Sequence, residues 1–258
     1  MIFDTHAHYD DDQFDGDRDE LLSSLQLAGI GRVVNVGADL PSTKSSIELA
    51  RNYPFIYAAA GVHPSDVDQL NEETFDWLED QLTREKVVAV GETGLDYYWE
   101  KDPLARQEQQ KWFRRQLDLA RRTHLPVIIH SREAAADTLA IAREEKLGDI
   151  GGVIHCFSYS KEMAREYLSM GMFLGIGGVL TYKNARVLKE VVDYAPMENL
   201  VLETDCPYLT PVPNRGKRNS SLNIPYVVSE IARIKGISRE KVEEITWDNA
   251  LRLYRMDS

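Results

Sequence analysis

The chain has 258 residues, of which 43% are hydrophobic and 28% are charged, and this composition is typical of a globular protein. No apolar run approaches the roughly 18 residues that cross a bilayer, and the first residues lack the basic and apolar regions of a secretory signal. Its two cysteines, Cys156 and Cys206, are too few for a disulfide framework or a Cys-rich zinc site. We therefore expect a reduced, cytoplasmic, monomeric protein without a membrane segment.

The charge balance is acidic, with 30 basic residues against 42 acidic residues and a net charge of −12. Proteins that coat nucleic acid nonspecifically are usually basic, so a DNA-packaging or transcription-factor role is disfavoured. An enzyme that binds a few phosphates locally is still allowed. A metal site built from carboxylates would itself add negative charge.

Eight short apolar runs rich in Val, Ile and Ala alternate with amphipathic stretches, as buried parallel strands alternate with helices. The predicted strands are residues 2–5, 33–37, 56–61, 87–91, 126–130, 152–155, 172–175 and 200–203. Between them, a helix is predicted over residues 17–28, with Gly29 following its end, and another over 103–123 with a proline at its start. Near the C-terminus, a helical repeat over 227–234 precedes Gly236, and Ser238 is predicted to cap a last helix that ends near Tyr254.

Eight βα units in about 250 residues match a single-domain α/β (β/α)8 TIM barrel over residues 1–258. An open doubly wound sheet is the alternative, but the glycine-rich phosphate loop expected after its first strand is missing. A glycine-rich stretch, residues 175–178, follows the seventh run; we favour tight turning there, with close approach to a substrate phosphate as the alternative. Residues 211–224 form the longest irregular segment, after the eighth strand.

Polar side chains of metal-binding type follow five of the eight predicted strands. His6 and His8 stand two residues apart at the end of the first strand, and this spacing places both side chains on one face of an extended backbone. The remaining residues of this kind are Glu92, His130, His155, Glu203 and Asp205. In a barrel all these strand ends meet at one face, and a convergence of histidines and carboxylates suits Zn, Mn, Fe or Mg.

Each of these residues taken alone has a plain structural alternative. His130 or His155 after an apolar run is more often a core histidine, Glu92 could cap a helix or pair with an arginine, and Asp205 could be a turn residue. Glu203 could be a buried ion-pair partner, or a carboxylate that contacts a metal ligand rather than the metal. The joint pattern favours a metal site, because every member follows a buried run.

Two further histidines are interpreted differently. His63 follows the third strand, and we expect it to face the substrate rather than bind a metal. His124 lies at a helix end and is expected to be structural.

Six stretches of the chain, in order, resemble the signature blocks of the TatD family of metal-dependent deoxyribonucleases. They are FDTHAH (3–8), GVHP (61–64), VGETGLDY (90–97), PVIIHSR (126–132), VIHCFS (153–158) and LETDCPYL (202–209). The segment PNRGKRN (213–219) resembles the basic loop of that family. Cys206 stands where alanine is common in the family, which should not affect metal chemistry.

The resemblance implies an amidohydrolase-like TIM barrel with two divalent ions, Mg²⁺ or Mn²⁺ being favoured and Zn²⁺ possible. Carried over by position, the first ion would be held by His6, His8, Glu92 and Asp205. The second would be held by Glu92, His130 and His155, with Glu92 bridging. The family is similar to 3′→5′ exonucleases of single-stranded DNA or RNA, and Asp205 and Glu92 would be the catalytic carboxylates, with Asp205 accepting the proton of the attacking water.

Candidate substrate contacts lie beside these blocks. Arg132, Arg215, Lys217 and Arg218 are suited to phosphate binding, although residues 213–219 could equally be a solvated basic turn. The aromatic run Tyr97-Tyr98-Trp99 could stack a base or form a hydrophobic lid.

Two other functions use the same residues. A related barrel could hydrolyse an amide, lactone or ester, including an aminoacyl ester on tRNA; such relatives often carry a carbamylated lysine at a strand end, and no predicted strand ends in lysine here. A non-catalytic metal-binding or scaffold protein is disfavoured, because a complete ligand set meets no structural need at a solvent-facing barrel mouth.

Overall fold

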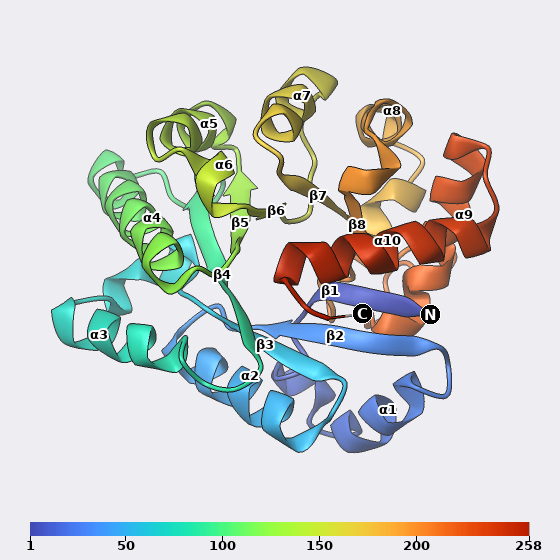
Figure 1. The fold of residues 1–258 in the computed structure, drawn as a ribbon, viewed down its shortest axis with the longest axis horizontal. Helices are drawn as coiled ribbons and strands as arrows, with labels where there is room; N and C mark the ends of the chain where they lie inside the picture. The colour runs from blue at the N-terminus through green and yellow to red at the C-terminus, as the bar shows by residue number, and fades with distance from the viewer. Residues whose placement is uncertain (258) are drawn as a thin grey trace.

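Eight parallel strands lie side by side in chain order in the computed structural model, which describes residues 1–257 (Figure 1). They are β1 (Ile2–Ala7), β2 (Ile30–Val36), β3 (Ile56–Ala60), β4 (Val87–Asp96), β5 (Val127–Arg132), β6 (Gly152–Ile154), β7 (Phe173–Ile176) and β8 (Leu200–Leu202). Each predicted strand is present, so the predicted (β/α)8 barrel is confirmed.

The last strand returns to the first, which makes the sheet a nearly closed barrel. Ala7 at the end of β1 forms a parallel bridge with Cys206 just after β8. The backbone N–H of His8 donates to the carbonyl of Cys206 at 2.9 Å, and that of Asp205 donates to the carbonyl of His6 at 2.9 Å. These bonds exclude the open doubly wound sheet.

Helices occupy the connections between the strands and form an outer layer (Figure 1). They are α1 (Arg18–Leu25), α2 (Leu40–Asn52), α3 (Glu72–Gln81), α4 (Pro103–Thr123), α5 (Ala135–Glu144), α6 (Leu147–Ile150), α7 (Lys161–Ser169), α8 (Arg186–Tyr194), α9 (Ile224–Lys235) and α10 (Arg239–Tyr254). The predicted stop and start between α9 and α10 are confirmed, because Gly236 is left-handed (φ +66°) and the Ser238 side chain accepts from the Lys241 N–H. None of the helices among residues 1–257 is both long enough and apolar enough to cross a membrane.

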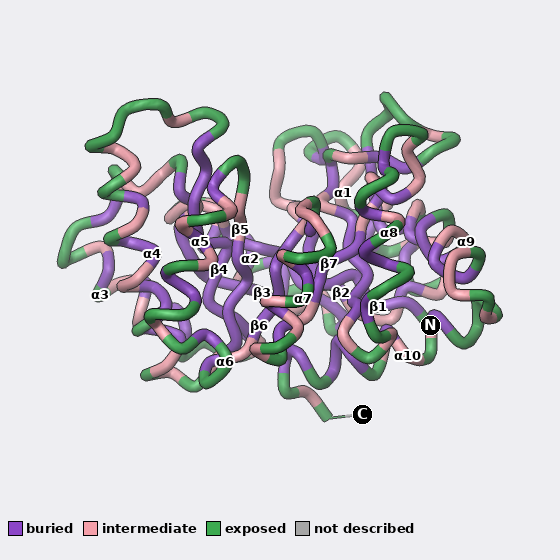
Figure 2. The backbone as a smooth tube through the Cα atoms, turned by 90° about the horizontal axis from the view of Figure 1, so that it is seen from above, coloured by how far each residue is buried: buried purple, intermediate pink, exposed green. Residues whose placement is uncertain are grey.

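The apolar residues pack in two layers. The larger core lies between the strands and the outer helices, and the smaller one fills the barrel and includes Val88, Ile128 and Val201. The strands are mostly buried, and the exposed residues lie mainly in the loops and on one face of the helices between them (Figure 2). Helix α10 belongs to the smaller core: the Tyr254 hydroxyl donates to the carbonyl of Thr5 at 2.6 Å. The N-terminal end of the barrel is thus packed with apolar side chains, which leaves the opposite end for a site.

Two local expectations differ from the structure, and a third is incomplete. Helix α1 ends at Leu25, so Gly29 (φ +85°) lies in the turn before β2 rather than at the helix end. Strand β4 continues to Asp96, which places Glu92 inside a strand rather than after one. The glycine-rich stretch does lead into a tight turn, the 3-10 helix Gly178–Thr181, but its glycines also provide space: a Cβ on Gly175 would lie 2.2 Å from Glu203 Oε2, and one on Gly178 would lie 2.0 Å from the Leu209 carbonyl oxygen. These glycines allow close packing of β7 against β8 and its loop.

Candidate metal centre

Three polar side chains of the site follow from strand periodicity. His130, His155 and Glu203 each stand two residues after a residue of the barrel interior; these interior residues are Ile128, Val153 and Val201. Side chains two residues apart in a strand share a face. All three therefore point toward the barrel axis at its C-terminal end.

Glu92 and His6 reach the same place through strand irregularities. The register of β1 on β2 shifts between Asp4 and Ala7, and the register of β4 on β5 shifts between Val90 and Thr93. Gly91 adopts φ +146°, and a Cβ there would lie 2.7 Å from the carbonyl oxygen of Ile128. Only glycine fits this position, and the local distortion lets Glu92 face the axis.

Four donor atoms meet where β1 and β8 adjoin. His6 Nε2 lies 3.0 Å from His8 Nε2, 3.5 Å from Glu92 Oε2 and 3.8 Å from Asp205 Oδ1. His8 Nε2 lies 3.4 Å from the Asp205 oxygen and 3.9 Å from the Glu92 oxygen. Ligands about 2.1 Å from one ion in a tetrahedral shell stand about 3.4 Å apart, so His6, His8 and Asp205 fit a divalent metal, and Glu92 Oε2 lies within 3.9 Å of both histidines.

The other carboxylate oxygen of Glu92 faces a second group of nitrogens. Glu92 Oε1 lies 2.8 Å from His130 Nδ1 and 3.8 Å from His155 Nε2. The same oxygen is 4.0 Å from His63 Nε2. Glu92 therefore stands between two sets of ligand-type atoms, each using one of its oxygens.

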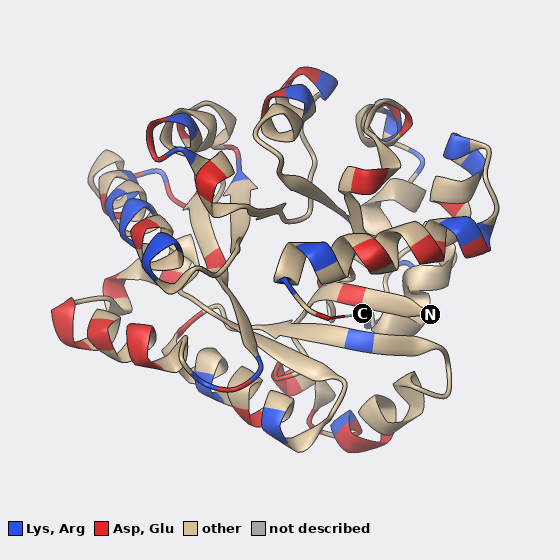
Figure 3. Ribbon diagram, viewed as in Figure 1, with Lys and Arg blue, Asp and Glu red and all other residues tan. Residues whose placement is uncertain are grey.

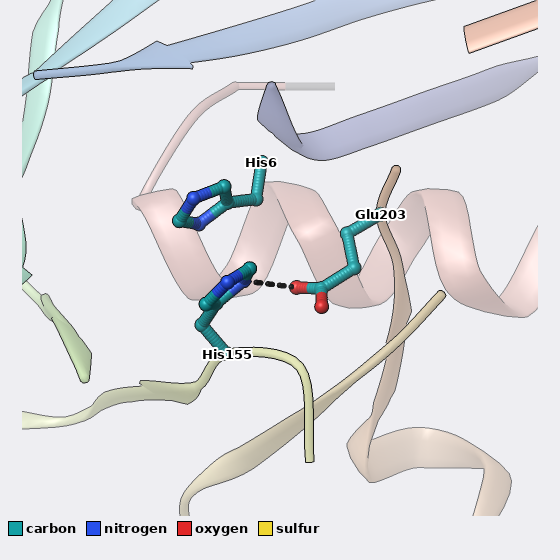
Figure 4. Close-up of side chains that lie close together, drawn as sticks. All are labelled: His6, His155 and Glu203. Atoms are coloured by element: carbon teal, nitrogen blue, oxygen red, sulfur yellow. Dashed lines mark hydrogen bonds and ion pairs between the residues drawn. The ribbon is translucent and has the colours of Figure 1, made fainter. Parts of the chain in front are cut away.

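Two carboxylates, Glu203 and Asp96, contact the ring nitrogens of His155 and His130 that face away from Glu92. Glu203 is 1% exposed, and its Oε2 lies 3.2 Å from His155 Nδ1 while its Oε1 accepts from the backbone N–H of Cys156 at 2.6 Å. The His155 ring also stacks on His6, with ring centroids 3.5 Å apart (Figure 4). Asp96 Oδ2 lies 3.1 Å from His130 Nε2. Such outer partners set which ring nitrogen carries the proton.

Asp96 is a residue that sequence reasoning left without a role. Its signal in the sequence was its place in the block VGETGLDY; its position at a strand end became visible only in the structure, where β4 continues to Asp96. Its other oxygen accepts from the backbone N–H groups of Tyr98 and Trp99, at 2.9 and 3.1 Å. Asp96 thus joins the site to the aromatic loop after β4.

The charges of the site favour metal binding. Burial raises the pKa of Glu92 and of Asp205, but the neighbouring histidines outweigh it and lower both, that of Glu92 well below its usual range. Burial lowers the pKa of His155, but Glu203 and Glu92 raise it to about 10; in the same way Asp205 and Glu92 raise that of His8 to about 9. Without a metal, protons on the histidines balance the carboxylates, and a cation would replace them.

His63 is neutral, unlike His8 and His155. Burial lowers the pKa of His63 to about 4, so the ring is neutral. Its Nδ1 accepts from the backbone N–H of Ser65 at 3.1 Å, which leaves the proton on Nε2. Nε2 faces Glu92 and the cavity, so this nitrogen is arranged to donate a hydrogen bond.

A cavity of about 860 Å³ opens over these residues. Arg132, Trp99 and His63 line it, and the Arg132 guanidinium lies 3.9 Å from the centre of the Tyr98 ring. The three basic residues of the loop after β8 do not line it. Arg218 forms a bidentate pair with Asp17, at 2.8 and 2.6 Å, so phosphate binding there would have to break an ion pair.

The chain is similar to known proteins along almost its whole length. The family model described as TatD related DNase matches residues 3–255. An uncharacterised metal-dependent hydrolase of Bacillus subtilis is 44% identical over 257 residues, with all of both chains covered. A 3′-5′ ssDNA/RNA exonuclease of Cronobacter sakazakii is 34% identical, covering 98% of this chain and 97% of its own.

Solved structures show the same likeness. A TatD homologue from Escherichia coli K12 superposes with a TM-score of 0.92 at 30% identity, covering 99% of this chain and 98% of its own. A TatD family hydrolase from Entamoeba histolytica superposes with a TM-score of 0.88 at 25% identity, with 98% of each chain covered. With its barrel and its clusters of histidines and carboxylates, the chain belongs to the TatD family and is a metal-dependent hydrolase.

Proposed function

We propose that this protein is a two-metal phosphodiesterase that removes nucleotides from the 3′ end of single-stranded DNA, with RNA as a second substrate. The observation that carries the proposal is the position of Glu92, whose two oxygens face separate groups of donors. Two ions sharing a carboxylate suit displacement at a phosphate. The direction of cleavage is taken from relatives named as 3′-5′ exonucleases.

Each of the two proposed ions would be held by its own set of side chains. His6, His8, Glu92 and Asp205 would hold one ion, and Glu92, His130 and His155 the other. Bound divalent ions would supply charge neutralisation at the phosphate and an activated water. We assign Mg²⁺ or Mn²⁺, because these ions suit carboxylate ligands and phosphate substrates.

Three side chains of the chain act on the substrate directly. Asp205 is ionised and lies at the mouth, so it accepts the proton of the attacking water. The Nε2–H of His63 donates to a phosphate oxygen, since its other nitrogen is already engaged. Arg132 lines the cavity and pairs with a phosphate of the bound strand.

The test is hydrolysis of a 3′-labelled single strand in Mg²⁺ or Mn²⁺, beside a panel of a lactone, a carboxylic ester and an aminoacyl ester. We expect the labelled 3′-terminal nucleotide to be released as a mononucleotide at the earliest times and the panel to be untouched. Turnover of the panel without nuclease activity would replace this proposal by an ester or lactone hydrolase.

Variants separate chemistry from folding. His6→Ala and Asp205→Asn should each abolish phosphodiesterase activity while the circular-dichroism spectrum stays native. His124→Asn is the matched control, because His124 is an exposed residue that ends α4 in the left-handed conformation, which asparagine tolerates. Turnover like that of the wild type in either site variant would remove the two-metal proposal.

A further inference from the structure

The rim of the catalytic cavity is acidic on one side. The loops after β1, β2 and β3 contribute four carboxylates to its lining: Asp10, Asp11, Asp39 and Asp66. Within residues 1–257, none of these four forms an ion pair with a lysine or arginine. Helix α3, which follows β3, carries acidic residues and no basic ones (Figure 3). A chain of phosphates would be repelled along this side.

Another part of the rim, formed by the loops after β7 and β8, carries cations and adjoins the loop after β1, where the Tyr208 hydroxyl donates to Asp11 Oδ2 at 2.8 Å. The loops after β7 and β8 present Lys183, Arg215 and Lys217, all exposed and none paired with a carboxylate among the described residues. The Arg215 guanidinium lies 4.2 Å from the centre of the Tyr182 ring, and the Tyr182 hydroxyl donates to the carbonyl of Thr210 at 3.0 Å. These contacts join the two loops into one wall.

That wall is continuous with the catalytic cavity. Val179 from the loop after β7 and Leu209 from the loop after β8 line the cavity itself. A Cβ on Gly178 would lie 2.0 Å from the Leu209 carbonyl oxygen, so the two loops are in direct contact at the cavity edge. The cations lie further along the same two loops.

A second cavity, of about 570 Å³, adjoins the first on the side of the loops after β3 and β4. Ser65 and Trp99 line both cavities, and Trp99 is 70% exposed. Pro64, Leu70 and Trp112 give this second cavity apolar surface, and its charged lining residues are Asp68, Glu100, Glu108 and Lys111. Glu108 and Lys111 pair at 2.8 Å, which leaves a net negative lining. An uncharged base fits this surface and a phosphate does not.

We infer that the polynucleotide leaves the metal centre across the wall formed by the loops after β7 and β8, with its phosphates on Lys183, Arg215 and Lys217, while the terminal nucleoside lies against Trp99 on the acidic side. This assignment rests on the proposed function and gives the bound strand a direction. It also supplies a physical reason for cleavage at an end: beyond the terminal nucleoside, the next phosphate would meet Asp66, Asp68 and Glu100. Arg218 takes no part, because Asp17 holds its guanidinium.

The inference is tested by binding without turnover. A thymidine 20-mer labelled with fluorescein at its 5′ end is titrated with full-length protein in Ca²⁺, with gels verifying that the strand stays intact, and an unlabelled dinucleotide serves as competitor. Replacing Lys183, Arg215 and Lys217 together by glutamine should raise the Kd of the 20-mer at least tenfold and that of the dinucleotide less than twofold. The slope of log Kd against log salt should fall by about 2, since each phosphate contact on a single strand contributes about 0.7.

Arg51→Gln is the matched control, because Arg51 is exposed in the last turn of α2, at the opposite end of the barrel.

A second experiment compares the binding of strands that end in a 3′-hydroxyl with that of strands that end in a 3′-phosphate. We expect the 3′-phosphate to weaken binding at least fivefold, and Asp66→Asn with Asp68→Asn to remove most of that penalty. A triple variant that binds the 20-mer within twofold of the wild type overturns the path, and equal binding of the two strand ends overturns the assignment of the terminal nucleoside. Either result leaves the nuclease assay above unaffected, whereas loss of nuclease activity with binding intact refutes only the proposed function.

Discussion

Replacing Glu203 by glutamine tests how the buried carboxylate behind His155 controls metal binding. In the native site one oxygen accepts from the Cys156 N–H at 2.6 Å and the other faces His155 Nδ1 at 3.2 Å. A glutamine has one acceptor, so whichever way its amide is turned, one of these buried donors faces an N–H group. A neutral His155 ring avoids this contact only by carrying its proton on Nε2, the nitrogen that faces Glu92 and Asp205.

The cost can be estimated in two ways. A buried donor left without an acceptor costs about 1–3 kcal/mol. Loss of an outer partner of a metal-binding histidine lowers metal affinity about 10- to 100-fold, which is about 1.4–2.7 kcal/mol. The two estimates agree. The carboxylate is closely packed, since a Cβ on Gly175 would lie 2.2 Å from Glu203 Oε2.

The assay is isothermal titration calorimetry with Mn²⁺, with thermal unfolding measured on the same samples. Glu203→Gln should bind the metal 10- to 100-fold more weakly and stay folded at the assay temperature. Glu133→Gln is the control, because this carboxylate lies just after β5 with 57% of its side chain exposed. Metal affinity within twofold of the wild type in a folded Glu203→Gln protein would show that the carboxylate does not orient His155.

Three other predictions address protons, ion pairs and packing. The pKa values of His155 and His8 are raised to about 10 and about 9, so both rings are protonated at pH 7 in the metal-free protein. Saturation with metal should therefore release about two protons. The apparent metal affinity should rise with pH up to about pH 9 to 10. Calorimetry in buffers of different ionisation enthalpy counts these protons, and release of less than half a proton would contradict the ligand assignment. The hydrogen bond from Arg233 lowers the pKa of Glu230 from its ordinary 4.5 to about 2, so its stabilisation is present above pH 4.5 and is lost as the pH falls toward 2. Glu230→Gln should therefore lower the free energy of unfolding by about 1 kcal/mol at pH 7 and by less at pH 3, as measured in urea; an equal loss at both values would refute this. Gly178→Ala should cost about 1–3 kcal/mol, because its Cβ would meet a backbone carbonyl at 2.0 Å, while Gly16→Ala, where a Cβ meets nothing within 4 Å, should be close to neutral in the same urea measurement.

Much of the fold could be predicted from local pattern. Short apolar runs alternating with helical repeats specify parallel strands covered by helices, and α4 begins and ends where its proline and its apolar spacing predicted. The ends of the helices and strands were predicted less accurately. Helix α1 stops early and β4 runs five residues past its predicted end at Gly91, because pairing with β5 rather than local propensity keeps residues 92–96 extended.

The candidate site could be predicted as a set of residues but not as an arrangement. Position at strand ends brought His6, His130, His155 and Asp205 to one mouth, because all parallel strands of a barrel end there. Spacing does not reveal which oxygen faces which nitrogen. The inward turn of Glu92 depends on a register shift against β5 and on the backbone of Gly91, and both are set by the neighbouring strand.

By itself, the sequence determined the barrel, the ring of histidines and carboxylates and the family, since each depends on short-range order that recurs along the chain. Only the tertiary structure decided how the remaining groups are used. Glu203 contacts a histidine because β7 presents Gly175 beside it, and Arg218 is engaged because Asp17, 201 residues away in sequence, lies within 2.6 Å. Contacts between residues so far apart depend on the closure of the whole barrel, and no local pattern encodes them.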